Sequence, residues 1–224
     1  VVSGALILGA VWGIYGTLPG KVEGFLVALA GGALMVSALS ELIEPSLEQT
    51  SLILVAVSVC IGAGLFILAD KLVEEKMGAD SGGGLLASIT LDGIPENLAL
   101  GVALITTGPM QVAALAGSIF LSNLPEAAGG AKEMAKKRPK LQVIGLWAAT
   151  AVLLSAAAIA GNLLLGGIDK TYLAALRCVA AGAVIASLAT AVFPKAYREG
   201  SYSAGIATAI GLLLALALGE LGGG

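Results

Sequence analysis

Long apolar segments, separated by short polar stretches, run through almost the whole chain. Eight of them are long enough to cross the hydrocarbon core of a bilayer, which takes roughly 20 helical residues. They cover residues 1–19, 23–46, 50–70, 84–107, 109–131, 141–165, 172–194 and 201–221. Membrane β-strands do not fit, because they span roughly 9–11 residues and alternate between apolar and polar positions. The pattern predicts an all-α membrane protein with eight transmembrane helices.

The composition strengthens this prediction. Hydrophobic residues make up 58% of the 224 residues and charged residues 12%, values that a water-soluble domain of this size would not show. We expect a single transmembrane domain over residues 1–224. Its predicted parts are three helices within 1–70, a cytoplasmic loop at 71–83, a central helix pair within 84–131, a basic cytoplasmic loop at 132–140, and three helices within 141–221.

The basic residues are divided unequally between the two sides of the predicted bundle. Ten of the 12 follow the first, third, fifth or seventh helix: Lys21, Lys71, Lys76, Lys132, Lys136, Lys137, Arg138, Lys140, Lys195 and Arg198. Only Lys170 and Arg177 belong to the other side. Because Lys and Arg favour the cytoplasmic side, we expect a multi-pass cell-membrane protein with both termini outside. The run "KEMAKKRPK" is then a topology anchor, or else a patch for lipids or a regulatory partner.

Two pairs of similar segments indicate an internal symmetry. "GALMVSALSELIEP" (32–45) matches "GAVIASLATAVFP" (182–194) at an offset of 150, and the two helices are predicted to run in opposite directions. "DGIPEN" (92–97) matches "SNLPEA" (122–127) at an offset of 30. This predicts an inverted repeat, in which the first three and last three helices surround the central pair. Inverted repeats with interrupted helices are typical of secondary transporters.

The matched Pro-Glu segments would place polar side chains in the membrane. Asp92 and Glu96 are four residues apart and share a helix face, as do Ser122 and Glu126, with Asn123 three residues before Glu126. Each proline also leaves the carbonyl four residues earlier without its helical hydrogen bond. Two antiparallel helices would therefore present similar sets of oxygen atoms.

The cost of placing charged groups in the membrane leaves two interpretations of these motifs. Each ionised carboxylate at the bilayer centre costs at least ~2.5 kcal/mol. The chain has no His, and the sequence places no Lys or Arg within a span at comparable depth. Either the carboxyls are protonated and join the helices by hydrogen bonds, or a cation binds between them. The repeated motif favours the cation.

The chain resembles the ZIP family of zinc and iron transporters. The features that carry the resemblance are the eight-helix plan, the segment "DGIPENLALGVAL" and the second Pro-Glu pair. The family's fourth-helix signature reads roughly His-Asn-aromatic-Pro-Glu-Gly. The resemblance implies that Glu96 and Glu126 bridge the metal. It places Asp92 where the signature has histidine, and Ser122 and Asn123 at two polar ligand positions.

The chain also departs from the family pattern. Gly93 replaces the signature asparagine, and the acidic ligands that many members supply from helices 6 and 7 are missing. The nearest residues at those two places are Ala157 or Ala158, and Thr190 or Ala191. The remaining ligands are all oxygen atoms, which suit Mg²⁺, Ca²⁺ and Mn²⁺ better than zinc. Glu41 and Glu44 would either collect cations at an outer entrance or be ordinary interfacial carboxylates.

The expected function is transport of divalent metal ions, of the zinc, iron or manganese class, toward the cytoplasm. The metal site would comprise Asp92, Glu96, Ser122, Asn123 and Glu126. Enzyme activity, a prosthetic cofactor and a nucleic-acid partner are not expected; the expected partners are the metal ion and the lipid bilayer, and a homodimer is left open. Two alternatives stand beside this one, a non-metal or proton-linked transporter and a non-transporting metal-binding membrane protein derived from the family.

Overall fold

The protein folds as a helical bundle in a computed structural model that describes residues 2–17, 19–77, 82–106, 112–165 and 167–222. The described residues contain helices and no strand. The elements are α1 (Gly4–Tyr15), α2 (Gly20–Ser37), η1 (Ala38–Ile43), α3 (Glu44–Leu47), α4 (Leu52–Met77), α5 (Gly82–Thr106), α6 (Ala113–Ala135), α7 (Lys140–Leu165), α8 (Lys170–Ser187), η2 (Leu188–Val192), α9 (Phe193–Gly200) and α10 (Ser203–Gly222). The prediction of an all-α protein is confirmed.

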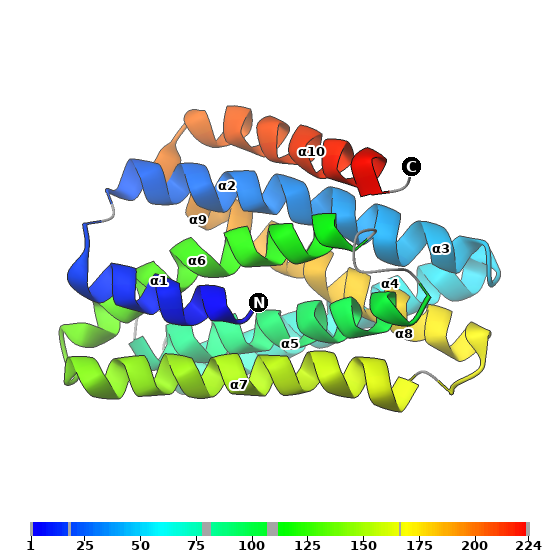
Figure 1. Cartoon of the computed structure of the whole chain (residues 1–224), viewed down its shortest axis with the longest axis horizontal. Coiled ribbons are helices and arrows are strands. Elements are labelled where there is room, and N and C mark those ends of the chain that lie inside the picture. The colour runs from blue at the N-terminus through cyan, green and yellow to red at the C-terminus, as the bar shows by residue number, and fades with distance from the viewer. Residues whose placement is uncertain (1, 18, 78–81, 107–111, 166, 223–224) are drawn as a thin grey trace.

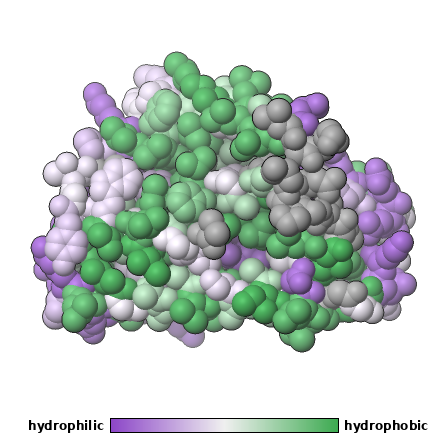
Figure 2. Space-filling model, in the orientation of Figure 1, coloured by the Kyte–Doolittle hydropathy of each residue, from purple (hydrophilic) through white to green (hydrophobic). Residues whose placement is uncertain are grey.

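Five continuous helices in the described part of the chain are long and apolar enough to cross a membrane. They are Gly20–Leu47, Leu52–Lys76, Lys140–Leu164, Lys170–Gly200 and Ser203–Glu220. Helix α1 is apolar but shorter, and α5 and α6 are not among the five. Figure 2 shows hydrophobic residues across the middle of the visible face, whereas most hydrophilic residues gather at the two ends, where helices begin and end in Figure 1. The chain is a multi-pass membrane protein by these features, while eight crossings remain a prediction.

Four helix pairs make the most extensive contacts in the bundle. Helix α1 packs on α6, α5 on α7, α2 on α10, and α4 on α8. One apolar cluster joins α1, α5, α6 and α7 around the fully buried Trp147. A larger one joins α2, α8 and α10 to the C-terminal half of α5 and the N-terminal half of α6. Helices α5 and α6 therefore contribute to both clusters.

The outermost helices differ in burial from the central ones. Among the apolar windows, 22% to 28% of residues are buried in the spans formed by α4, α7 and α10. The corresponding shares are 56% for the span that begins with α2 and 61% for the span that begins with α8. Helices α4, α7 and α10 therefore present apolar side chains to the bilayer, while the spans that contain η1 and η2 lie inside the bundle.

The two segments matched in the sequence, 32–45 and 182–194, have the same local structure. Helix α2 covers residues 20–37 and α8 covers 170–187, so they share the offset of 150. Each then passes without a break into a π-helix, η1 or η2, and on into a short α-helix with proline in its first turn. The π-helix η1 has six residues and η2 has five, which matches the one-residue difference in length between the segments. The sequence comparison did not predict π-helices; an inserted residue produces them in an otherwise regular helix.

Backbone contacts at four glycines follow the same relationship. A Cβ atom on Gly32 would collide with the Thr208 carbonyl, and one on Gly182 with the Val59 carbonyl. Likewise, Gly211 lies against the Leu29 carbonyl, and Gly62 against the Val179 carbonyl. In each case the α2 residue plus 150 gives its α8 counterpart, and the α4 residue plus 149 gives its α10 counterpart, the lower offset being the one expected after the shorter η2. Helix pairs α2·α10 and α4·α8 are thus held by equivalent small-residue contacts.

Several predicted boundaries were wrong in detail. The loop predicted at 71–83 is shorter, because α4 continues to Met77 and α5 begins at Gly82. The loop predicted at 132–140 is reduced to residues 136–139 between α6 and α7. The helix predicted at 172–194 extends from Lys170 to Gly200, so Lys195 and Arg198 lie in a helix rather than a loop. Charged residues at helix ends were interpreted as loops because hydropathy falls there before the backbone changes conformation.

Candidate cation site on helices α5 and α6

Both Pro-Glu motifs lie near the middle of their helices. Glu96 is residue 15 of the 25 in α5, and Glu126 is residue 14 of the 23 in α6. The helices continue through Pro95 and Pro125, so the expected interruption of α5 and α6 is not observed. Each proline still lacks the N–H group that would bond to the carbonyl four residues before it. The departures from α-helical geometry occur instead in η1 and η2.

The predicted site residues whose side chains are described are all buried. Glu96 is 5% exposed, Glu126 8%, and Ser122 and Asn123 2% each. Asp92 lies in α5, but its side chain is outside the described part of the structure. Because α5 and α6 contact one another, four of the five predicted residues lie buried on a pair of adjacent helices.

One hydrogen bond orients the carboxyl group on α6. The Ser122 hydroxyl donates to Glu126 Oε1 over 2.9 Å, as their four-residue spacing allows. The bond leaves the other carboxyl oxygen of Glu126 available for a ligand. Glu126 is therefore held in one orientation by its own helix.

Among the described side chains of the site, Asn123 is the one with a buried polar atom that lacks a partner. Its Nδ2 atom is buried and makes no hydrogen bond among the described residues. A carboxamide can also rotate to exchange its oxygen and nitrogen, which are nearly indistinguishable in shape. A buried amide without a partner costs about 1–3 kcal/mol. A water molecule from the hydration shell of a bound ion would accept from this N–H group and offset that cost.

Asn97 is a buried polar residue that the sequence interpretation missed. It is 1% exposed and donates from Nδ2 to the Gly93 carbonyl over 2.9 Å. It follows Glu96 directly, so the motif "DGIPEN" contained the signal. This bond uses the amide nitrogen and not Oδ1.

A polar seam runs along one face of α6, defined by Ser118, Ser122 and Glu126. These residues are spaced by four and are all buried. Ser118 lies 3.4 Å from the hydroxyl of Ser37, the last residue of α2 before η1. At this end the seam therefore meets the beginning of a π-helix.

An ion pair closes the other end of the polar seam. Lys195 Nζ in α9 lies 2.9 Å from Glu23 Oε1 in α2, with side-chain exposures of 24% and 13%. Gly129, one turn beyond Glu126 on α6, allows this approach, since a Cβ atom there would lie 2.5 Å from Glu23 Oε1 and 3.3 Å from Lys195 Nζ. The charges of Lys195 and Glu23 are both close enough to act on Glu126. From Ser118 to Gly129 the seam extends about 16 Å along the helix.

Two basic residues that the sequence placed at the membrane surfaces have side chains that are buried or mostly shielded from solvent. Lys195 belongs to the continuous helix Lys170–Gly200 and faces inward onto Glu23. Arg177, assigned from sequence to the outer side, is the eighth residue of α8 and is 1% exposed. Both cations were assigned to membrane surfaces because hydropathy locates helix ends but not the direction of a side chain. Part of the negative charge near Glu126 is thus balanced by the protein itself.

The chemistry of the donor set limits which ions would bind. No three Cys, Asp or Glu side chains come together around one ion among the residues that the structure describes. The chain has no His. The available donors are carboxylate, hydroxyl, amide and backbone carbonyl oxygens, a set that suits harder divalent cations. These oxygen donors would suit one hard cation that keeps some of its water molecules. They would suit a soft metal less well, because soft metals prefer thiolate ligands.

The helices that carry further acidic ligands in the resembling family supply none here. Ala158 contributes its backbone carbonyl to a close contact with Gly101. Thr190 donates its hydroxyl to the Ala186 carbonyl over 2.9 Å within its own helix. At the two positions where the sequence lacks acidic ligands, the residues present therefore take part in helix packing and in a hydrogen bond within the helix.

The chain matches no protein-family model and has no match among curated proteins. Any functional assignment consequently rests on the residues and their arrangement.

Proposed function

We propose that the protein is a ZIP-like transporter of divalent metal ions that moves them toward the cytoplasm through a site on α5 and α6. Glu96 and Glu126 would bind the ion, Asp92 and Asn123 would complete its shell, and Ser122 would orient Glu126. The observation that carries this proposal is the burial of both motif glutamates near the middle of adjacent helices. Ionisable groups at such depth in membrane proteins commonly mark a substrate or ion pathway.

The equivalent contacts of the two bundle halves support an inverted repeat around the site. Helices α2 and α8 and their glycine contacts are related by an offset of 150, and the contact residues of α4 and α10 by an offset of 149, one less because η2 is one residue shorter than η1. If the chain crosses the membrane eight times, successive helices run in opposite directions. The two halves would then have opposite orientations in the membrane. Alternating access in such folds comes from movement of one repeat bundle against the other around a fixed site. In this proposal α5 and α6, which contribute to both apolar clusters, carry that site.

The ion pair at the end of the polar seam has a defined role in this proposal. Lys195 would place a positive charge on the release side of Glu126, paired with Glu23. A cation moving along the seam would meet this charge only after leaving the glutamate. The pair would therefore close the pathway until the surrounding helices separate.

Metal uptake into proteoliposomes that contain a metal-sensitive dye tests the proposal. Wild-type protein is expected to take up Mn²⁺ or Zn²⁺, and Glu96→Gln combined with Glu126→Gln is expected to abolish uptake. The matched control is Glu220→Gln, which removes an exposed carboxylate of α10. Uptake retained by the double variant would contradict the proposal, as would an equal loss in the control.

The internal charge balance favours one alternative. Because Lys195 and the Ser122 hydroxyl already stabilise the charged form of Glu126, the site could function without a metal, as a proton relay in a non-metal transporter. Flux that depends on pH but not on metal would support this alternative. Metal binding without flux would instead support the non-transporting, metal-binding membrane protein.

A further inference from the structure

A pocket of about 410 Å³ lies where α4, α5, α6 and α7 approach one end of the bundle. Its walls come from nine residues, Val73, Leu86, Ala87, Thr90, Leu91, Ile94, Met134, Arg138 and Leu146. It lies apart from the candidate cation site, since none of the buried site residues lines it. The pocket is therefore a different site from the proposed metal site.

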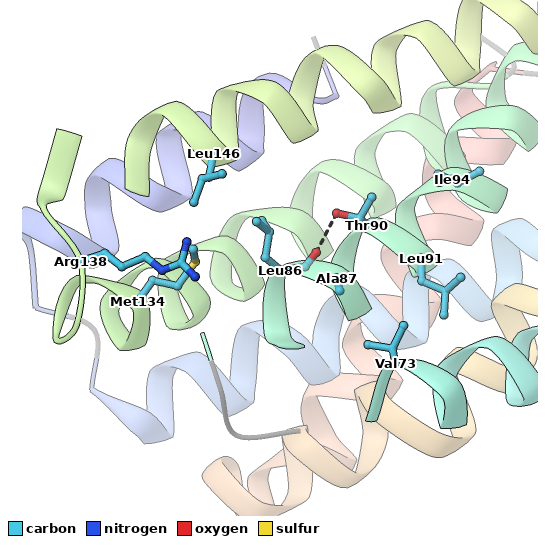
Figure 3. Close-up of a pocket in the computed structure, with 9 residues that line it drawn as sticks. All are labelled: Val73, Leu86, Ala87, Thr90, Leu91, Ile94, Met134, Arg138 and Leu146. Atoms are coloured by element: carbon cyan, nitrogen blue, oxygen red, sulfur yellow. Dashed lines mark hydrogen bonds between the residues drawn. The ribbon is translucent and has the colours of Figure 1, made fainter. Parts of the chain in front are cut away.

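The lining combines apolar walls with one cation. Seven of the nine lining side chains are apolar, and Arg138 is the charged one. Thr90 uses its proton within α5, donating to the Leu86 carbonyl over 2.7 Å. In Figure 3 the Arg138 side chain extends along the pocket past Met134, toward Leu86 and Leu146. A guanidinium group is thus offered at one end of an apolar pocket.

The pocket lies at a membrane surface as judged by the ends of the apolar spans. The span of α4 ends at Lys76, one turn beyond Val73, and the span of α7 begins at Lys140, two residues beyond Arg138. Lys136 and Lys137 precede Arg138 and are exposed. Lys136 is paired with Glu133 over 2.6 Å, whereas neither Lys137 nor Arg138 forms an ion pair in the described part of the structure.

We propose that this pocket binds an anionic phospholipid, with its phosphate on the Arg138 guanidinium and an acyl chain along the apolar walls. The guanidinium group is suited to phosphate because its N–H donors form a planar fork. A free phosphate ion would gain nothing from the walls, and a zwitterionic lipid would gain less from the charge. Basic pockets between helices at a membrane surface are a recurrent form of lipid recognition.

Native mass spectrometry of the full chain in detergent micelles tests this site. Phosphatidylglycerol and phosphatidylcholine with identical acyl chains are added in equal amounts, and the bound lipids are counted. Wild-type protein is expected to retain phosphatidylglycerol preferentially. Arg138→Gln is expected to reduce that preference roughly fivefold, which corresponds to the ~1 kcal/mol of one basic residue near an anionic surface. Ala87→Leu, which fills the pocket, is expected to reduce binding of both lipids.

Lys137→Gln is the matched control, because it removes a neighbouring exposed charge that does not line the pocket. Its lipid preference is expected to equal that of the wild type. A preference unchanged in Arg138→Gln, or reduced equally in Lys137→Gln, would overturn the proposal in favour of a diffuse basic surface. Displacement of the lipid by excess inorganic phosphate would likewise overturn it by assigning the site to a free anion. Arg138 and Lys137 are both exposed, so neither variant disturbs the core.

Discussion

Lys195 Nζ lies 2.9 Å from Glu23 Oε1, and a Cβ atom added to Gly129 would approach both groups, one helical turn from Glu126. Three helices thus bring two carboxylates and one ammonium group together at the end of the polar seam. Because the pair is mostly shielded from solvent, it is expected to stabilise the contact between α2 and α9. In the proposed transport pathway, the pair would close the end of the polar seam on the release side of Glu126.

Removing one member of this pair is expected to cost more stability than removing both. Lys195→Met leaves Glu23 without its partner, and breaking a buried pair costs about 3 kcal/mol. Glu23→Gln is expected to cost a similar amount, whereas the double variant restores part of the loss. Thermal unfolding of the four proteins in detergent measures this coupling as a double-mutant cycle. Additive losses would show that the two charges do not interact.

Two glycines in α4 are expected to respond differently to the same substitution. Gly62 lies against the Val179 carbonyl of α8, whereas a Cβ atom at Gly64 meets nothing within 4 Å. Gly62→Val is therefore expected to destabilise the protein by at least about 1–3 kcal/mol through overpacking, and Gly64→Val by much less. The melting temperatures of the two variants, compared in one detergent, measure the difference. Equal melting temperatures would contradict the close α4·α8 contact.

Removing the Ser122 hydroxyl is expected to weaken metal binding without abolishing it. Ser122→Ala deletes the 2.9 Å hydrogen bond to Glu126, and a bond to a charged group contributes about 1.5–3 kcal/mol. A roughly tenfold loss of affinity is expected, since 1.4 kcal/mol corresponds to tenfold. Isothermal titration with Mn²⁺ measures it. Ser155→Ala is the control, because Ser155 donates only to the Ala151 carbonyl of its own helix, and an equal effect there would argue against a role for Ser122.

Single cysteines are expected to report the predicted orientation. In a Cys60→Ser background, which removes the exposed native thiol, Lys137→Cys and Lys170→Cys place one reactive group at each end of the bundle. A membrane-impermeant maleimide applied to intact cells is expected to label Lys170→Cys, and to label Lys137→Cys only after permeabilisation. The reverse result would invert the topology, and with it the proposed direction of transport.

Much of the architecture could be predicted from the sequence, because apolar length alone determines where helices lie in a membrane protein. The helical segments correspond to the predicted ones, and the repeated segments 32–45 and 182–194 have matching structure. The π-helices could not be predicted from hydropathy. The single-residue difference in length between the repeats accounts only for the difference between the six-residue η1 and the five-residue η2.

The burial of the motif residues could be predicted from the sequence, but the residues that surround them could not. Burial of Glu96, Ser122, Asn123 and Glu126 follows from their positions in apolar helices. The contact of Glu23 with Lys195 joins residues 172 positions apart, both at helix ends that resemble loops in composition. No local pattern encodes such a pair. It depends on the packing of α2 against α9 and on the space left by Gly129.

Anomalous diffraction from crystals soaked in Mn²⁺ tests most directly whether the two motif glutamates form one cation site. The account predicts a single peak bound by Glu96 and Glu126 in the wild type, coordinated by oxygen atoms, and no peak there in the Glu96→Gln/Glu126→Gln variant. A peak that persists in that variant, or metal bound only elsewhere in the wild type, would contradict the account.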